Sequence, residues 1–310
     1  MTPLTNALAN YLTVRRTLGY KLVRAEQLLT QFISYLAERG MQTVTTELAV
    51  AWATLPAGRD PRWWSYRLSV VRGFAGYLQT LDPATQVPPA NVLPAGRTRR
   101  ATPYLYTEEE ILTLIAAAAS TLRFKLRVVT YQTLIGLLAV SGMRVGEAIR
   151  LNRDDIDFEN ELLTVYHSKF DRSREIPLHP STVNALRGYL HQRDRLHPSP
   201  GTPAVFVSTT GTRLLYTNVS QTFRLLKTHA GLHPRSGACR PRIHDLRHTF
   251  AVNTLLDAYR SDGEIQPRLA LLCTYLGHVN PSNTYWYLSG SPELLALASR
   301  RLEHDHGDQL

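Results

Sequence analysis

Three short segments of the chain contain residue types that can bind and cleave a phosphate ester. They are Ser141-Gly142-Met143-Arg144-Val145-Gly146-Glu147, then His244-Asp245-Leu246-Arg247-His248-Thr249-Phe250, and finally Leu276-Gly277-His278, which is followed nine residues later by Tyr287. In-line attack on a phosphodiester adds negative charge to its nonbridging oxygens, and preorganised cations stabilise that charge. Arginine suits the task because its planar guanidinium can bind two oxygens and stays protonated. Arg144 and Arg247 are therefore the candidate phosphate ligands.

The order of these segments carries more information than any one of them. A single arginine on a helix is more often a surface charge, and the pattern H-x-x-R arises readily by chance. All three segments in this order, with a predicted strand pair between the first two, resemble the tyrosine recombinase, or phage integrase, family. The resemblance covers residues 104–310 closely. It extends weakly to residues 1–81, which are similar to the helical core-DNA-binding (SAM-like) domain of that family.

The resemblance implies a function and a role for each candidate residue. The chain would be a site-specific recombinase that cleaves and rejoins duplex DNA through a 3′-phosphotyrosine intermediate, with no metal and no cofactor. Tyr287 would be the nucleophile, although a phenol with a pKa of about 10 needs assistance at neutral pH. His244 would assist proton transfer at the tyrosine, and His278 would donate a hydrogen bond to a nonbridging oxygen. Lys169, on the turn between the two strands, would protonate the leaving 5′ oxygen as general acid.

Two of the candidate positions keep a second interpretation. Tyr285 lies two residues before Tyr287, and on a helix the two side chains would point about 200° apart, so only one could face the phosphate. The nine-residue step from the histidine favours Tyr287. Glu147 shares a helical face with Arg144 and, by the resemblance, helps to order the site. The alternative for Glu147 is a simple surface ion pair.

The elements that must position these residues have mainly helical patterns. A capping box at residues 107–110 predicts a helix start. Residues 162–167 and 174–178 predict two strands joined by a turn at residues 170–173. Further helices are expected over residues 131–140, 181–196, 218–230, 244–259, 267–276 and 281–288. The predicted fold is mainly α, with a small antiparallel β-sheet.

An apolar stretch at residues 293–298 predicts a short helix near the end of the chain. Its leucines must be buried against some surface. They could fold back onto their own domain or, as the resemblance suggests, dock onto a neighbouring protomer.

The first part of the chain predicts a separate helical domain. Apolar residues at three and four spacing indicate helices over residues 4–18, 22–39, 47–54 and 63–80. Gly19 and Gly40 follow two of these patterns, as expected of helix stops. The predicted organisation is a core-DNA-binding domain at 1–81, a Pro/Arg-rich linker at 82–103 and a catalytic domain at 104–310. By the resemblance, the two domains would form a clamp around duplex DNA.

Basic residues of the first part are candidate DNA contacts. Three lie on the fourth predicted helix and three in the linker: Arg62, Arg67, Arg72, Arg97, Arg99 and Arg100. Five prolines disfavour a helix over residues 82–103, so an extended basic segment could follow a DNA backbone. A solvated basic face is the alternative.

The charge of the whole chain also favours an acidic polymer as partner. The 310 residues carry a net charge of +10 at an estimated pI of 9.8. Residues 1–103 hold 12 Lys and Arg against 5 Asp and Glu, whereas residues 104–310 hold 23 against 20. Lysine and arginine displace condensed counterions from nucleic acid, so this balance suits DNA.

The composition argues against several other classes of protein. Two cysteines make no disulfide framework and have no zinc-finger spacing. The N-terminus lacks the pattern of a signal peptide, and no apolar run is long enough to span a membrane. We therefore expect a cytoplasmic protein. Asp154, Asp155 and Asp157 are expected to form a polar turn rather than a two-metal site.

By the resemblance, the partners are double-stranded DNA and further recombinase subunits. The assembly would be a homotetramer on two DNA sites, or one shared with related recombinases. A type IB topoisomerase and a catalytically inactive DNA-binding accessory protein of the same fold are the alternatives. The compact length and helical first part argue against the former, and the presence of all six expected catalytic side chains argues against the latter. The sequence does not distinguish among an integrase, a resolvase and a transposon recombinase.

Overall fold

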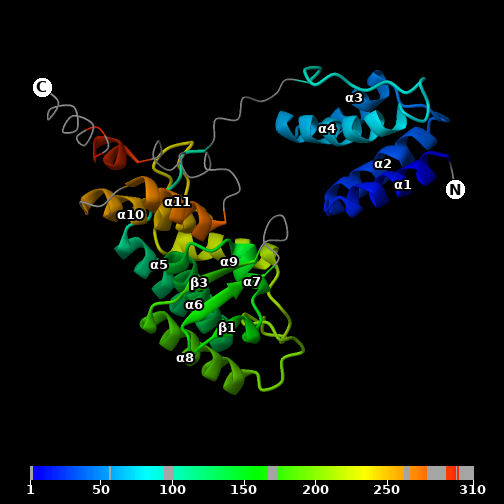
Figure 1. Ribbon diagram of the computed structural model, residues 1–310. Helices are drawn as coiled ribbons and strands as arrows, with labels where there is room; N and C mark the ends of the chain where they lie inside the picture. The colour runs from blue at the N-terminus through cyan, green and yellow to red at the C-terminus, as the bar shows by residue number, and fades with distance from the viewer. Residues whose placement is uncertain are drawn as a thin grey trace, which may run out of the picture. The chain divides into compact units, whose positions relative to one another are not determined.

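The chain divides into two compact units, residues 1–100 and residues 101–310 (Figure 1). The structure is a computed structural model, and it describes residues 3–55, 57–93, 101–166, 173–261, 265–277, 291–297 and 299. Among these residues, no helix has the length and apolar character needed to cross a membrane.

The first unit is built from four helices around one apolar core. They are α1 (Pro3–Thr17), α2 (Val23–Ala37), α3 (Thr46–Thr54) and α4 (Pro61–Leu78). Their apolar stripes meet at fully buried residues such as Phe32 and Phe74, and the rings of Phe32 and Trp52 lie 5.2 Å apart. Gly19 and Gly40 both adopt positive φ just beyond α1 and α2, as a helix stop requires. The four predicted helices are confirmed to within a few residues.

The proline-containing segment after α4 packs against the first unit as far as residue 93. The amide of Gln86 donates to the carbonyl of Val44 at 2.8 Å, and the amide of Thr46 donates to Gln86 Oε1 at 2.9 Å. Arg72 donates to the carbonyl oxygens of Pro88 and Pro89 at 2.7 and 3.0 Å. Residues 82–93 are thus anchored to the bundle. Residues 94–100 lie outside the described residues.

The second unit surrounds its larger core with helices. They are α5 (Glu108–Thr121), α6 (Lys125–Ser141), α7 (Val145–Arg150), η1 (Arg153–Asp155), α8 (Pro180–Leu196), α9 (Tyr216–His229), α10 (Asp245–Arg260) and α11 (Ile265–Leu276). The predicted capping box forms, since the Glu110 amide donates to Thr107 Oγ1 and the Thr107 amide donates to Glu110 Oε2. The helix predicted at residues 281–288 lies outside the described residues.

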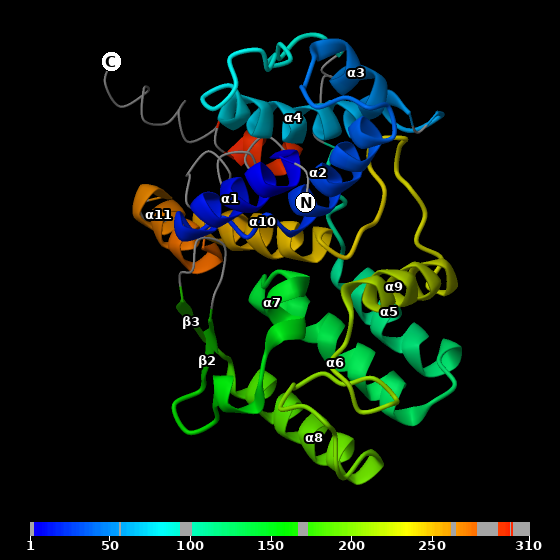
Figure 2. The ribbon, with the colours of Figure 1, turned by 90° about the vertical axis from the view of Figure 1, so that its right-hand side faces the viewer.

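A three-stranded antiparallel sheet joins these helices in the order β1 (Ile156–Asp157), β2 (Leu162–Val165) and β3 (Arg174–Pro177). Leu163 pairs with both Ile156 and Ile176, and all three side chains are buried. The two predicted strands are confirmed. The expectation of a plain polar turn at residues 154–157 is wrong in part. Ile156 is buried in the core, and together with Asp157 it forms strand β1. Figure 2 shows β2 and β3 extending towards α11, and β3 contacts that helix.

Helices α10 and α11 form a second, smaller core with the segment at residues 291–297. Leu294 is fully buried there, and Leu297 packs against the same cluster, whereas Leu295 is exposed. The described part of the apolar C-terminal stretch therefore folds back onto its own unit, as the first of the two alternatives predicts. Residue 298 and residues 300–310 lie outside the described residues.

Candidate active site

The first motif forms the junction between α6 and α7. Gly142 ends α6 in the left-handed conformation with φ of 58°, and a Cβ at this position would lie 2.4 Å from the ring of Phe250. Glycine is therefore required both by the turn and by the close approach of α10. The turn places Arg144 at the N-cap position of α7, where its side chain is 29% exposed.

The carboxyl end of α11 brings the three motifs together. Its last carbonyl groups have no partner inside the helix and need outside donors. Arg247 donates from Nη2 to the Leu276 carbonyl at 2.5 Å and from Nη1 to the Gly142 carbonyl at 2.7 Å. Arg144 donates from Nη2 to the Gly277 carbonyl at 3.4 Å. Two arginines far apart in sequence therefore meet beside the residue that precedes His278.

Glu147 accepts hydrogen bonds from the amide and side chain of Arg144 and from the side chain of Arg174. Its Oε1 accepts from Arg144 Nη1 at 2.7 Å and from Arg174 Nη1 at 3.2 Å. Its Oε2 accepts from the Arg144 amide at 2.9 Å and from Arg174 Nη2 at 2.8 Å. Because the Glu147 side chain is only 2% exposed, the interpretation as a simple surface ion pair is excluded.

These contacts determine the charge of the Glu147 carboxyl group. Burial by itself would raise the pKa of Glu147, but the hydrogen bonds and charges of Arg174 and Arg144 prevail and lower that pKa to about 2. The cluster therefore contains one carboxylate and two guanidinium groups and keeps a net positive charge at neutral pH.

His244 lies at the start of α10, one helical turn before Arg247. The side chain of His244 is partly exposed to solvent. Even so, its pKa is lowered to about 4, first by the partial loss of water around the ring and then by the positive charges of Arg247, Arg144 and Arg242. The imidazole is therefore neutral at neutral pH and can accept a proton.

Asp245 fixes the backbone around His244. It is fully buried and accepts hydrogen bonds from the amide, Nε and Nη2 of Arg242 at 3.0, 3.0 and 2.7 Å. The Thr249 hydroxyl donates to the Asp245 carbonyl and accepts from the amide of Tyr106. This network connects the start of α10 to the segment that leads into α5.

Of the predicted site residues, the structure brings together Arg144, Glu147, His244 and Arg247. Lys169, His278 and Tyr287 lie outside the described residues, as does the rival Tyr285, so their roles stay predictions. Arg97, Arg99 and Arg100 also lie outside them.

The three predicted DNA contacts on α4 have different environments. Arg62 is exposed, with a side chain 61% accessible, and pairs with Asp60. Arg67 is buried, lies 3.7 Å from the centre of the Trp52 ring and donates to the Trp52 carbonyl at 2.8 Å. A phosphate contact by Arg67 does not fit this position, because its guanidinium is enclosed by the core. Arg72 contacts the prolines after α4, as described above.

Arg174 belongs to the site, although the sequence did not identify it. It lies at the start of β3 with its side chain 11% exposed, and its partner Glu147 is 27 residues away in sequence. An arginine is too basic to donate a proton readily, so the role expected of Lys169 does not extend to Arg174. The available signal was its place directly after the predicted turn, which makes its side chain a neighbour of the turn.

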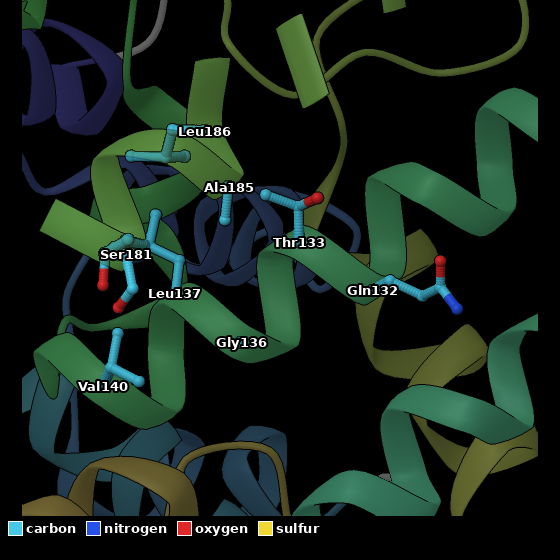
Figure 3. Close-up of a pocket in the computed structure, with 9 residues that line it drawn as sticks. Gln132, Thr133, Gly136, Leu137, Val140, Ser181, Ala185 and Leu186 are labelled. Atoms are coloured by element: carbon cyan, nitrogen blue, oxygen red, sulfur yellow. The ribbon is translucent and has the colours of Figure 1, made fainter. Parts of the chain in front are cut away.

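A groove of about 420 Å³ in the second unit has Glu147 in its lining, together with Arg150, Tyr166 and Arg213. A groove of about 370 Å³ runs between α6 and α8, where Leu137 and Val140 face Ser181 and Ala185 (Figure 3). None of the predicted catalytic residues lines it. Among the described residues, no group of three or more His, Cys, Asp or Glu side chains could hold a metal ion.

Comparison with known proteins places this geometry in context. Residues 105–293 match the model of the phage integrase family. A Sinorhizobium fredii protein named integrase/recombinase y4rB is 43% identical over 315 residues, with all of both chains covered. The tyrosine recombinase XerC of Chlamydia trachomatis is 30% identical over 230 residues, which cover 74% of this chain and 67% of that protein.

The fold also matches a solved structure, a lambda integrase tetramer bound to a Holliday junction. The match has a TM-score of 0.61 at 20% identity and covers 92% of this chain and 76% of that one. At this identity, the similarity concerns the fold alone.

Proposed function

The chain belongs to the phage integrase family, the tyrosine recombinases, and from that membership we propose how its residues cleave DNA. Its function is site-specific cleavage and rejoining of duplex DNA through a 3′-phosphotyrosine intermediate. The observation that carries the assignment of the site is the convergence of Arg144 and Arg247 at the carboxyl end of α11, one residue before His278.

Arg144 and Arg247 bind the nonbridging oxygens of the scissile phosphate and stabilise the charge that develops during in-line attack. Fixed guanidinium groups supply here the charge that metal ions supply in two-metal nucleases. Their orientation is set before DNA arrives, because carbonyl groups and Glu147 already hold both side chains.

Two proton transfers complete the reaction. Tyr287 attacks the phosphorus, and His244, neutral in the free protein, accepts its proton or hydrogen-bonds the phosphate. His278 donates to a nonbridging oxygen. Lys169 protonates the departing 5′ oxygen, which becomes a free 5′ hydroxyl. Rejoining reverses these steps and needs no ATP, because the phosphotyrosine keeps the energy of the cleaved bond.

The partners follow from the same membership. The chain acts on double-stranded DNA as one subunit of an assembly, which we propose to be a tetramer on two DNA sites. We propose further that residues 1–81 form the core-DNA-binding domain and that the protein acts in the cytoplasm.

A covalent capture experiment tests the proposed site and identifies a substrate. The protein is incubated in EDTA with a library of duplexes of random sequence, each carrying a nick that lets a short 5′-hydroxyl fragment diffuse away after cleavage. Adducts that survive denaturant are isolated and sequenced, and the enriched duplex serves as the substrate in later experiments. We expect adducts from the wild type and none from Tyr287→Phe, because the variant lacks only the nucleophilic oxygen.

Tyr285→Phe is the matched control for the nucleophile and should still form the adduct. An adduct with Tyr287→Phe but not with Tyr285→Phe would reassign the nucleophile. Absence of any wild-type adduct in EDTA, with adducts restored by magnesium at equal ionic strength, would contradict the metal-free mechanism.

A further inference from the structure

Arg174 lies where three elements of the second unit meet, and the reaction proposed above gives it no role. It begins β3, five residues after Lys169 in sequence, and its guanidinium reaches across to α7 and α11. On α7 it binds both carboxylate oxygens of Glu147. On the α11 side it packs against Gly277, where an added Cβ would lie 3.2 Å from Arg174 Nη1. The residue therefore connects the strand after the lysine turn with the two segments that hold the phosphate-binding arginines.

The charges of this cluster explain why a second arginine is needed. A buried Glu147 paired with Arg144 alone would cancel the charge of Arg144 just where a phosphate must bind. With Arg174 present, each oxygen of the carboxylate accepts two hydrogen bonds, and the cluster keeps one net positive charge. Arg174 thus makes Glu147 a rigid support for Arg144 without neutralising the site.

Burial strengthens this arrangement. The side chains of Glu147 and Arg174 are 2% and 11% exposed, so water screens their contact far less than it would a surface pair. Removing one partner of such a pair leaves the other charge buried and without compensation. Glu147 would then protonate more easily or shift towards Arg144, and either change would alter the position or charge of the phosphate ligand.

We propose that Arg174 is a positioning residue for DNA cleavage, which holds Glu147 so that the Arg144 guanidinium stays oriented and positively charged towards the scissile phosphate. The inference rests on the proposed function, since it concerns the phosphate site of the same reaction. Its effect passes through Glu147 and Arg144, not through Lys169, even though Lys169 lies nearer in sequence.

The test compares Arg174→Gln with Arg174→Lys on the duplex recovered by covalent capture. Duplex binding is measured by gel shift, and adduct formation is measured in a single turnover at saturating protein. We expect Arg174→Gln to bind the duplex nearly as well as the wild type but to form the adduct more slowly by on the order of 10- to 100-fold. Arg174→Lys should recover part of the loss, because it restores the charge but not the bidentate fork.

Arg153→Gln is the matched control. Arg153 also pairs with a carboxylate, that of Asp194, but on η1 and outside the site. The Arg153→Gln variant should cleave DNA at the wild-type rate. Thermal unfolding of all variants separates a slower reaction from a loss of fold.

Three outcomes distinguish positioning through Glu147 from other roles. First, the acid limb of the Arg174→Gln rate profile should move towards neutral pH, because Glu147 is then without the guanidinium that lowers its pKa. Second, Glu147→Gln with Arg174→Gln should be no slower than Glu147→Gln alone, since both changes disable one unit. Third, a substrate with sulfur at the 5′ leaving position should not rescue Arg174→Gln.

Rescue by the sulfur substrate would overturn the inference, because it would show that Arg174 acts through the general acid. Equal losses in binding and cleavage would overturn it as well, by assigning Arg174 to the DNA grip. If the wild type forms no adduct with any duplex, it is the proposed function that fails. The Glu147 contact is then read from acid unfolding, where Arg174→Gln should lose stability at a higher pH than the wild type.

Discussion

At the scale of single residues, the site holds positively charged side chains in fixed positions where a phosphate can bind them. Arg144 and Arg247 are held by carbonyl groups and by Glu147, so little reorganisation is needed when a phosphate enters. The partial loss of water around the His244 ring, together with these charges, lowers its pKa and keeps the imidazole neutral. Preorganised arginines thus form the anion site and also contribute to the neutral state of the neighbouring proton acceptor.

The pKa of His244 should therefore report on occupation of the site. In the free protein we expect His244 to titrate near pH 4, because partial desolvation and the neighbouring arginines disfavour the imidazolium. A bound phosphate brings negative charge and should raise the pKa, as should Arg247→Ala. Titration of the histidine ring signals by NMR, with His244→Gln to assign the resonance, measures both shifts. An unchanged His244 pKa on binding the captured duplex would place the phosphate elsewhere.

Glu147 should give the folded state a defined dependence on acid. Its folded pKa of about 2 lies below the ordinary value of 4.5, so the stabilisation is fully present above about pH 4.5 and is lost as pH falls towards 2. The limit is roughly 3.5 kcal/mol, at about 1.4 kcal/mol for each unit between the two pKa values. Urea unfolding at a series of pH values should show the wild type losing its advantage over Glu147→Gln in this range. A constant difference between them would contradict the lowered pKa.

Much of the site at this scale could be predicted, and the exception has a physical reason. Arg144, Arg247 and His244 occur in local motifs whose spacing carries the information. Arg174 does not, because its acceptor is 27 residues away on α7, and only the tertiary packing of β3 beside that helix brings the two together. The predicted DNA contact of Arg67 does not fit its position for a related reason. A basic residue on an amphipathic helix can stack on a buried tryptophan instead of facing solvent.

At the scale of elements, long amphipathic helices were predictable and short or tertiary features were not. Helices such as α2 and α8 repeat their apolar pattern over several turns. Strand β1 has two residues, too few to show any period, and it exists because Ile156 packs beside Leu163. The segment at residues 82–93 is rich in proline, which predicts its lack of helix, but its attachment depends on Arg72 and Gln86 finding distant partners.

The turn between α6 and α7 offers a sharp test of how elements fix the site. Gly142→Ala should destabilise the fold by roughly 1–3 kcal/mol, because φ is positive and the new Cβ would press on the Phe250 ring. Gly136→Ala is the control, since Gly136 lies inside α6 and a Cβ there would meet nothing closer than 4.0 Å. It should be neutral or stabilising by up to about 1 kcal/mol. Denaturant unfolding compares the two, and equal effects would remove the special role of the turn.

At the scale of the whole molecule, the two units carry different shares of the charge and of the chemistry. Each has its own apolar core, the first around Phe32 and Phe74, the second around α5 to α9. All the described catalytic candidates lie in the second unit, while residues 1–103 hold 12 Lys and Arg against 5 Asp and Glu. This division predicts that the first unit contributes mainly electrostatic grip and the second the reaction.

That division can be measured by the dependence of binding on salt. Residues 101–310 alone should fold, because the described buried clusters of this unit consist of its own residues, but should bind the captured duplex more weakly than the full chain. The slope of log K against log salt should also be shallower, by about 0.9 for each DNA phosphate that residues 1–100 neutralise in the full chain. In the full chain, Arg62→Gln should reduce the slope by at most the share of one phosphate, whereas Arg67→Gln should mainly lower stability, since Arg67 is enclosed beside Trp52. Equal slopes for the full chain and for residues 101–310 would mean that the basic first unit does not bind the DNA backbone, and its charge would then need another partner.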